Sequence, residues 1–212
     1  MIGNQSRAGY IGASDTKWVM RKNRMSQSFK NWWSVKLGAD PQFYGNEFTR
    51  AGNMWEHSIL TAVNPQIDFD RTIILDNRKM LLRVNYDGNT AHSIYEVKTH
   101  KNDHDFELTK EYWMQAQVQM FAWKYAHEHG LPDTNFGEVE ELESLTVVSY
   151  ALTPADVYRD FDDDEAYAGK MLVDKDRLQY HEVEYDKAWI KGEYLQNLKE
   201  LSKYLRKGQY PA

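Results

Sequence analysis

Two short apolar segments, close together in the sequence, carry charged residues at positions that restrict how this chain can fold. The first, Leu82–Gly88, carries Asp87 near its end, and the second contains Glu96-Val97-Lys98. Strand residues two apart point to the same face, so Glu96 and Lys98 project together while Val97 points into the core. Pairing of the two segments as neighbouring strands brings Asp87 within reach of Glu96. Two carboxylates beside a lysine suit a hard divalent cation held against a phosphate.

The length and composition indicate one soluble domain over residues 1–212. A chain of 212 residues is long enough for one sizeable core and short for two. No stretch approaches the roughly 20 apolar residues of a membrane span, and the first residues lack the apolar core of a signal peptide. The absence of Cys excludes disulfides, thiol catalysis and cysteine-based metal sites. We therefore expect a cytoplasmic protein that does not engage a membrane.

Charge is distributed unevenly along the chain. Residues 1–36 contain seven basic residues and one acidic residue, a net charge of +6, whereas the whole chain has a net charge of -6. The remainder therefore carries a net charge of -12. This polarity fits a local surface for an anionic ligand on an otherwise acidic body. A solvated basic helix is an equally good explanation of the charge alone.

The spacing of apolar residues predicts a basic helical part, residues 1–40, followed by a core, residues 41–212. Helices are predicted over residues 17–25, 27–37, 45–63, 110–129 and 185–206, and strands over residues 71–75, 80–86, 92–99, 144–152 and 178–183. The sequence Asp87-Gly88-Asn89 is predicted to turn the chain between two strands. This order is typical of an α/β domain with a mixed central β-sheet flanked by helices.

Glu56 is the candidate for a third metal-binding acid. It ends the sequence Gly52-Asn53-Met54-Trp55-Glu56, inside a predicted helix that is otherwise apolar on one face. A third carboxylate brought to Asp87 and Glu96 would complete a cation site. Taken alone, Glu56 is better explained as a solvated helix residue.

Gln117 is a candidate for a polar contact inside the protein or with a ligand. Its predicted helix is apolar around much of its circumference, so its amide requires a partner. Gln115 and Gln119 share a different face of that helix, so the three amides cannot all converge on one site. A core glutamine bonded to the backbone is the competing interpretation of Gln117.

Arg7 and Ser14 are candidates for an anion-binding pair. Ser14 stands at the start of a predicted helix, where free N–H groups and the positive end of the helix dipole favour a phosphate. Arg7 would add a forked guanidinium. The competing interpretation of Ser14 is an ordinary serine N-cap.

Taken in order, these segments resemble the lambda-type phage exonucleases (YqaJ-like viral recombinases) of the PD-(D/E)XK nuclease superfamily. The resemblance covers roughly residues 7–123 and implies a restriction-endonuclease-like core. It also implies roles for single residues: metal ligands Glu56, Asp87, Glu96 and the Val97 carbonyl; catalytic residues Asp87, Glu96 and Lys98; and 5′-phosphate contacts Arg7, Ser14, Asn85 and Gln117. Asn85 departs from the family pattern, which often has Ser two residues before the metal-binding Asp, although an amide can still donate a hydrogen bond.

The resemblance further implies an activity and partners. The implied activity is a Mg²⁺-dependent 5′→3′ exonuclease on double-stranded DNA ends, with Mn²⁺ able to substitute, which leaves 3′ single strands for recombination by strand annealing. A single-strand annealing protein and a trimeric ring are the implied partner and assembly, and the host-cell cytoplasm is the implied location. The alternatives are an endonuclease of the same fold and a DNA-binding protein with a nuclease-like fold but no activity.

Overall fold

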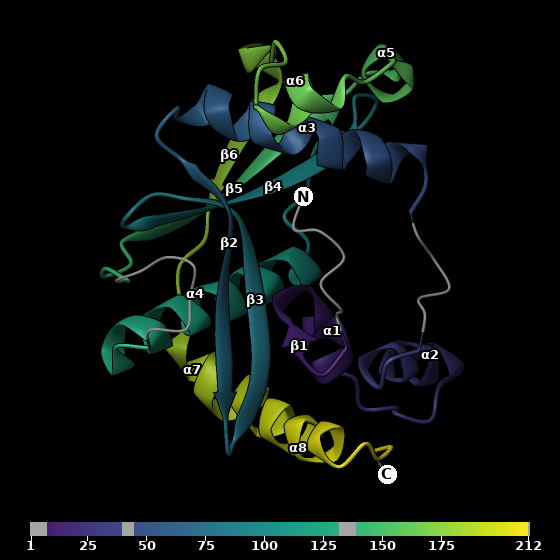
Figure 1. Cartoon of the computed structure of the whole chain (residues 1–212), viewed down its shortest axis with the longest axis vertical. Coiled ribbons are helices and arrows are strands. Elements are labelled where there is room, and N and C mark those ends of the chain that lie inside the picture. The colour runs from purple at the N-terminus through teal and green to yellow at the C-terminus, as the bar shows by residue number, and fades with distance from the viewer. Residues whose placement is uncertain (1–7, 40–44, 132–138, 212) are drawn as a thin grey trace.

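A long β-hairpin forms one side of the central sheet in the computed structural model, which describes residues 8–39, 45–131 and 139–211 (Figure 1). In this part of the chain the sheet consists of β1 (Ile11–Gly12), β2 (Asp68–Asn77), β3 (Met80–Asn89), β4 (Ser93–Lys101), β5 (Ser144–Leu152) and β6 (Leu178–Glu182). The strand order is β1-β3-β4-β5-β6, with β2 paired to β3. The pairs β1–β3 and β4–β5 are parallel and the others are antiparallel. The predicted mixed sheet is therefore confirmed.

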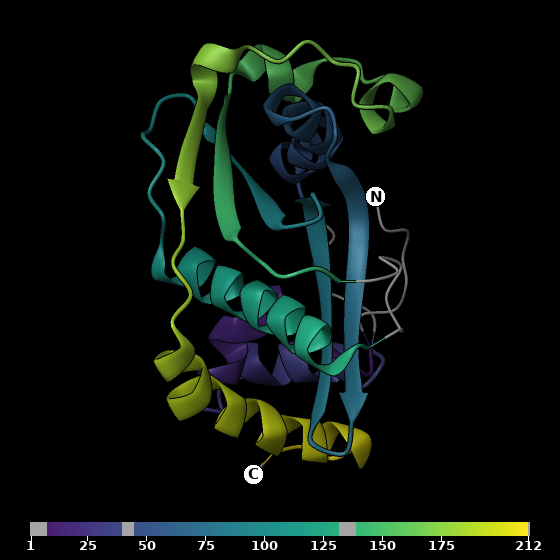
Figure 2. The same ribbon diagram turned by 90° about the vertical axis from the view of Figure 1, so that its left-hand side faces the viewer.

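Helices cover both faces of this sheet (Figures 1 and 2). One face carries α3 (Glu47–Val63) with α5 (Pro154–Tyr158) and α6 (Asp163–Tyr167), and the other carries α4 (Lys110–His129) and α8 (Leu195–Arg206). The other described helical segments are α1 (Thr16–Val19), α2 (Gln27–Lys36), α7 (Lys187–Trp189), the 3-10 turns η1 (Ala13–Asp15) and η2 (Lys175–Arg177), and the π-helical segment η3 (Ile190–Tyr194). None of the helices in the described ranges combines the length and apolar character needed to cross a membrane.

Two hydrophobic cores lie on the two faces of the sheet. The larger core joins α1, α2, α4 and α8 to the β2–β3 hairpin, and Trp33 and Trp123 are completely buried in it. The smaller core lies under α3, where Trp55 packs against Tyr150 of β5 with 5.8 Å between ring centroids. The sheet is therefore held from both sides, which is what keeps side chains on its strands in fixed positions.

The sheet divides into a fork between β3 and β4. These strands pair at only two positions, Gly88↔Tyr95 and Asn89↔Ile94, and then separate. Figure 2 shows β3 continuing along β2 while β4 turns away toward β5 and β6. Residues 87–89 thus continue β3, and the predicted turn at Asp87-Gly88-Asn89 is wrong; the chain turns at residues 90–92. The cause is that Gly88 pairs on both sides, with Phe69 of β2 and Tyr95 of β4.

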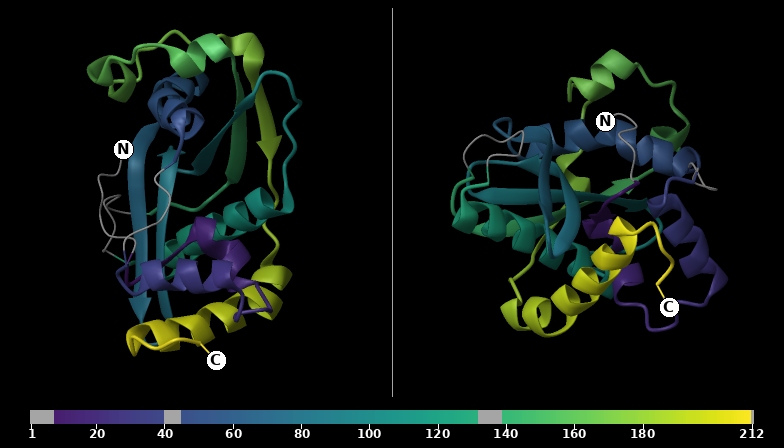
Figure 3. Two further views of the ribbon diagram at one scale, coloured as in Figure 1. Left: turned by 90° about the vertical axis from the view of Figure 1, so that its right-hand side faces the viewer. Right: turned by 60° about the horizontal axis from the view of Figure 1, so that its bottom comes forward.

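The amino-terminal part is less helical than predicted. The helix expected over residues 17–25 ends at Val19, because the following segment bonds to itself: Met25 N–H donates to Asn23 Oδ1 (3.1 Å) and Ser26 Oγ donates to the Asn23 carbonyl (3.1 Å). Such local side-chain bonds compete with the helix. Ser26 then caps α2. Figure 3 shows α1 and α2 packed beside α8.

Candidate active site

Asp87 lies at the point where β3 and β4 separate. Beyond the last β3–β4 pair the Val97 N–H faces the fork, and it donates a hydrogen bond to Asp87 Oδ2 (2.9 Å). The Asp87 side chain thus takes the place of a strand partner for β4. Because the N–H and C=O of one strand residue point to the same edge, the Val97 carbonyl also faces the fork.

Glu96 is held by three donors at once. Its side chain is only 4% exposed, and its two carboxylate oxygens accept hydrogen bonds from the Lys98 ammonium and from the amides of Gln115 and Gln119. The two glutamines are four residues apart and so share one face of α4. A buried carboxylate with this many partners has one position, which also places the Lys98 ammonium beside it.

α3 brings Glu56 to the fork from the opposite side. Two glycines allow this close approach. A Cβ built on Gly52 would lie 2.7 Å from Thr99 Oγ1 of β4, and a Cβ on Gly88 would lie 2.8 Å from a leucine methyl of α3. The absence of these two Cβ atoms lets the helix lie against both strands of the fork, where the charge of Glu56 contributes to the raised pKa of Asp87.

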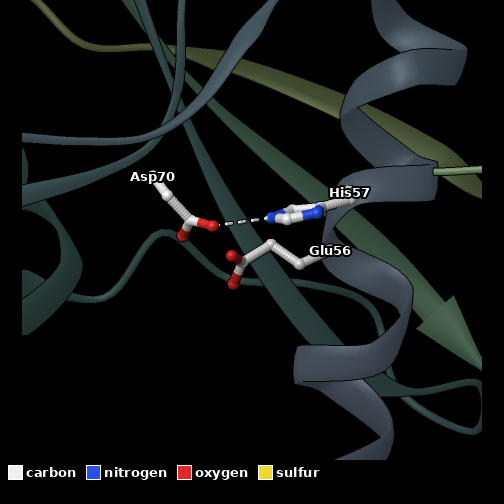
Figure 4. Close-up of side chains that lie close together, drawn as sticks. All are labelled: Glu56, His57 and Asp70. Carbon is white, nitrogen blue, oxygen red and sulfur yellow. Dashed lines mark ion pairs between the residues drawn. The ribbon is translucent and has the colours of Figure 1, made fainter. Parts of the chain in front are cut away.

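The β2–β3 hairpin supplies a further acid, Asp70. It lies opposite Asp87 in the strand register but outside the regular ladder, and its φ of 56° is a left-handed conformation that non-glycine residues rarely adopt. His57 Nε2 lies 3.2 Å from Asp70 Oδ2, and its Nδ1 lies 2.9 Å from the Tyr167 carbonyl. In the described ranges, Glu56, His57 and Asp70 offer metal-ligand atoms within 4.8 Å of one another (Figure 4).

Two acids at the fork, Glu56 and Asp87, have strongly raised pKa values. Burial raises the pKa of Glu56 to about 7, and the nearby Glu96 adds to the rise. Burial also raises the pKa of Asp87 well above its usual range, with Glu96 and Glu56 contributing. For Lys98, burial lowers the pKa, but the charges of Glu96 and Asp87 outweigh it and raise the pKa, so the side chain is an ammonium. The single positive charge of Lys98 cannot neutralise the carboxylates of Glu56, Asp87 and Glu96.

This donor set fits a hard divalent cation. Carboxylate and backbone carbonyl oxygens are the preferred ligands of Mg²⁺, and a cation at the fork would relieve the repulsion that raises the acids' pKa values. The sequence predicts Glu56, Asp87, Glu96 and the Val97 carbonyl as its ligands, whereas in the described ranges the side chains whose ligand atoms lie within 4.8 Å of one another are Glu56, His57 and Asp70. Asp70 and His57 would extend the same set on the side of α3.

Asn85 is oriented as a hydrogen-bond donor near this group. It precedes Asp87 by two residues and therefore lies on the same face of β3. Its Oδ1 accepts hydrogen bonds from Thr72 Oγ1 (3.0 Å) and Arg83 Nε (3.3 Å). Because the oxygen is engaged in this way, the amide nitrogen of this exposed residue faces away from both partners. That orientation suits a contact with a phosphate.

The other predicted phosphate contacts are placed differently. Ser14 is exposed in η1, directly after β1, which runs beside β3. Arg7 lies outside the described residues. Gln117 is completely buried; its amide donates to the Glu184 carbonyl (2.7 Å) and accepts from the Asp186 N–H (2.6 Å). The structure does not bring Gln117 to the acids. Gln117 is instead a core glutamine whose amide is bonded to the backbone, as the competing interpretation has it.

Four residues of this site carry no clear signal in the sequence pattern: His57, Asp70, Gln115 and Gln119. For the two glutamines, the four-residue spacing shows a shared face but not which face of a largely apolar helix meets the acids. Asp70 lies opposite Asp87 because the hairpin turns at Arg78-Lys79. This position can be predicted only if the exact register of the hairpin is known.

Comparison with known proteins places the chain in a family. The model of the YqaJ-like viral recombinase domain matches residues 4–137, whereas no curated protein matches. A phage-related exonuclease structure from Haemophilus somnus is 13% identical, with 93% of this chain and 95% of that chain covered and a TM-score of 0.61. The alkaline exonuclease LHK-Exo from Laribacter hongkongensis is 17% identical, with 95% and 93% covered and a TM-score of 0.55. A structure of LHK-Exo with dAMP is 18% identical, with 95% and 92% covered and a TM-score of 0.57.

At these identities the likeness to solved structures shows a shared nuclease-type fold. The family match is the stronger finding, because it covers more than half of the chain and includes Glu56, Asp87, Glu96 and Lys98. The chain, with its acids and lysine gathered at a strand fork, therefore belongs to the YqaJ-like viral recombinase domain family.

Proposed function

We propose that this chain is a divalent-metal-dependent exonuclease that digests one strand of double-stranded DNA from its 5′ end. The observation that carries the proposal is the meeting of Glu56, Asp87, Glu96 and Lys98 at one fork, from α3, β3 and β4. The chain belongs to a recombinase family and shares its fold with proteins that are named exonucleases, and both findings support phosphodiester hydrolysis as the reaction.

The residues at the fork divide the work of phosphodiester hydrolysis. A bound Mg²⁺, for which Mn²⁺ can substitute, supplies Lewis-acid chemistry that activates water and neutralises phosphate oxygens. Glu56, Asp87, Glu96 and the Val97 carbonyl would hold the ion. The Lys98 ammonium, fixed beside Glu96, donates to a phosphate oxygen and stabilises the negative charge that develops at phosphorus.

The direction of digestion is proposed from contacts with a 5′-terminal phosphate. Asn85 presents its amide nitrogen two residues from Asp87, about 6.8 Å along the strand, which is comparable to the spacing of consecutive phosphates in a nucleic acid strand. A terminal phosphate at Asn85 therefore places the next phosphate at the metal site. Ser14, in the turn beside β3, and Arg7 are proposed to complete the contact.

The proposal extends to partners and location. A 5′→3′ exonuclease leaves a 3′ single strand, which is the substrate of a single-strand annealing protein. A trimeric ring around the duplex would allow an acidic chain to retain DNA, since only the inner surface must be positive. The Cys-free composition fits a reducing cytoplasm.

The test is digestion of linear duplexes that carry a label at one chosen terminus, with Mg²⁺. We expect immediate release of a 5′-terminal nucleotide, late release of a 3′ label, and faster digestion of 5′-phosphate than of 5′-hydroxyl ends. Removal of the metal with EDTA should stop the reaction, and closed circular DNA should remain intact.

Three outcomes would contradict the proposal. Early loss of the 3′ label would reverse the direction. Cutting of closed circles would identify an endonuclease of the same fold. Binding to DNA ends without hydrolysis in either Mg²⁺ or Mn²⁺ would identify a non-catalytic DNA-binding protein.

A further inference from the structure

We propose that Tyr112 is a positioning residue that holds the Lys98 ammonium at the fork, and that Phe106 fixes Tyr112 for this purpose. The inference rests on the proposed nuclease function and concerns the orientation of the Lys98 ammonium group. Lys98 Nζ, bonded to Glu96, also lies 5.2 Å from the centroid of the Tyr112 ring. That distance is within the range of a cation–π interaction.

A single contact does not fix the orientation of a lysine ammonium group. Its ammonium is a compact charge on a flexible four-carbon stem, with three donors that rotate freely. The bond to Glu96 fixes the distance of Lys98 from the acids but not the direction of its remaining N–H groups. The Tyr112 ring attracts the ammonium and fills the space beside it. It therefore restricts Lys98 to the conformations that keep Nζ at the fork.

Tyr112 is itself fixed by its surroundings. It lies in the first turn of α4, where its N–H donates to Thr109 Oγ1 (3.3 Å), the N-cap of the helix. Its ring stacks on Phe106 with 5.9 Å between centroids and an interplanar angle of 8°. The start of the helix and the stack together determine where the ring faces Lys98.

Phe106 belongs to the connection from β4 to α4 and is anchored to the sheet. Its ring lies 4.8 Å from the His181 ring of β6 and 5.7 Å from the His100 ring of β4. The Nε2 atoms of both histidines are buried without a hydrogen-bond partner in the described ranges. Ring contacts are thus the interactions that join both imidazoles to Phe106. A continuous set of ring contacts joins the sheet to Tyr112 and so to Lys98.

The experiment compares Tyr112→Leu with the conservative Tyr112→Phe in digestion of a 5′-phosphorylated duplex. We expect Tyr112→Leu to lower kcat about tenfold with KM unchanged. Tyr112→Phe should stay within about twofold of wild type, because the cation–π contact is made with the ring, which phenylalanine also supplies. Phe106→Leu should lower kcat in the same direction. The double variant should be no slower than Tyr112→Leu alone, since both changes remove one effect.

Tyr125→Leu is the matched control. Tyr125 lies on the same helix about 20 Å away and stacks on His129 with 3.9 Å between centroids, so its loss removes a similar ring without touching the fork. We expect its kcat to equal that of the wild type. In a Lys98→Ala background, Tyr112→Leu should cause no further loss.

The inference is overturned if Tyr112→Phe is as slow as Tyr112→Leu, if the loss appears in KM, or if Tyr112→Leu slows the Lys98→Ala variant further. These results leave the proposed function intact, because the wild type still digests DNA ends. A wild type that does not digest DNA ends under the same conditions refutes the proposed function instead.

Discussion

At the scale of single residues, Glu56 links the site to the stability of the fold. Its pKa is raised from an ordinary value of 4.5 to about 7, first by burial and then by Glu96. The folded protein therefore binds this proton more tightly than the unfolded chain does. The stability that this group contributes is complete below about pH 4.5 and is lost as the pH rises through about 7.

We therefore predict that Glu56→Gln stabilises the metal-free protein in a pH-dependent way. At pH 8 the variant should exceed the wild type in free energy of unfolding by on the order of 3 kcal/mol, and near pH 4 the two should be nearly equal. Urea unfolding in EDTA at the two pH values measures this difference. A difference that is the same at both pH values would contradict the proposed cause.

Asp87 is the residue for which activity and binding should separate. Asp87→Asn keeps a side-chain oxygen for the Val97 N–H but removes a carboxylate proposed to bind the metal. We predict that hydrolysis falls by roughly a thousandfold or more while the affinity for duplex ends changes little. The matched control is Asp76→Asn, at the far end of the same hairpin, where the carboxylate contacts Arg206 (2.8 Å). Equal losses in the two variants would remove Asp87 from the reaction.

At the scale of elements, the site depends on how closely α3 approaches the fork. Gly88 is a point of close approach, because a Cβ there would lie 2.8 Å from Leu60 Cδ2 of α3 and 2.6 Å from Ile67 Cγ2 of the segment that follows the helix. These atoms belong to side chains buried in the smaller core, so they cannot move aside without disturbing it. Any displacement of α3 also displaces Glu56.

Gly88→Ala should therefore weaken both the fold and the cation site. We predict a loss of about 1–3 kcal/mol in the free energy of unfolding and a rise in the Mg²⁺ concentration needed for half-maximal digestion. Gly192→Ala is the control, since a Cβ there meets nothing within 4 Å. A loss of stability with an unchanged Mg²⁺ requirement would show that α3 does not set the position of a metal ligand.

Elements with strong local signals are predictable from the sequence, and the fork is not. The helix predicted over residues 110–129 is confirmed to the residue, because Thr109 caps its start and Gly130, with a φ of 57°, ends it. The sequence Asp87-Gly88-Asn89 has an equally strong local turn signal. Here pairing with strands on both sides overrides it, and such non-local pairing is not visible in a local pattern.

The same distinction applies to the candidate site. Glu96 and Lys98 follow from the alternation of one strand, so their shared side is predictable. The choice among three glutamines is not, because α4 is buried on nearly all sides and the sequence does not say which face meets Glu96. Gln117 is the glutamine that the resemblance assigns to the 5′-phosphate, yet Gln115 and Gln119 contact the Glu96 carboxylate.

At the scale of the whole molecule, the charges are separated into an acidic site and a basic amino-terminal part. Lys36 and Asp15 form a buried ion pair (2.5 Å), and Asp15 also accepts a hydrogen bond from Trp32 Nε1 (2.7 Å). These contacts fasten α2 to the turn after β1. The basic residues nearby are thus held rigidly on the body, which is what a fixed contact with a DNA backbone requires.

The loop between α1 and α2 is where this surface can be tested. Lys22 is exposed there, and Arg21 lies next to it with its guanidinium 5.2 Å from the Trp18 ring. We predict that the double variant Arg21→Glu/Lys22→Glu weakens duplex binding and makes it less dependent on salt, with the slope of log affinity against log salt reduced by about 2. The value of kcat at saturating DNA should not change, because neither side chain belongs to the fork.

The double variant Lys170→Glu/Lys175→Glu provides the control for charge itself, because it changes the net charge by the same amount and both side chains are exposed, Lys175 within η2. This change also makes an acidic protein more acidic, but it should leave the salt slope as in the wild type. If both variants weaken binding equally, net charge alone governs association. If only the amino-terminal change acts, the duplex lies along α1 and α2 on its way to the fork, and the basic residues between these helices are the feature that lets an acidic chain hold DNA.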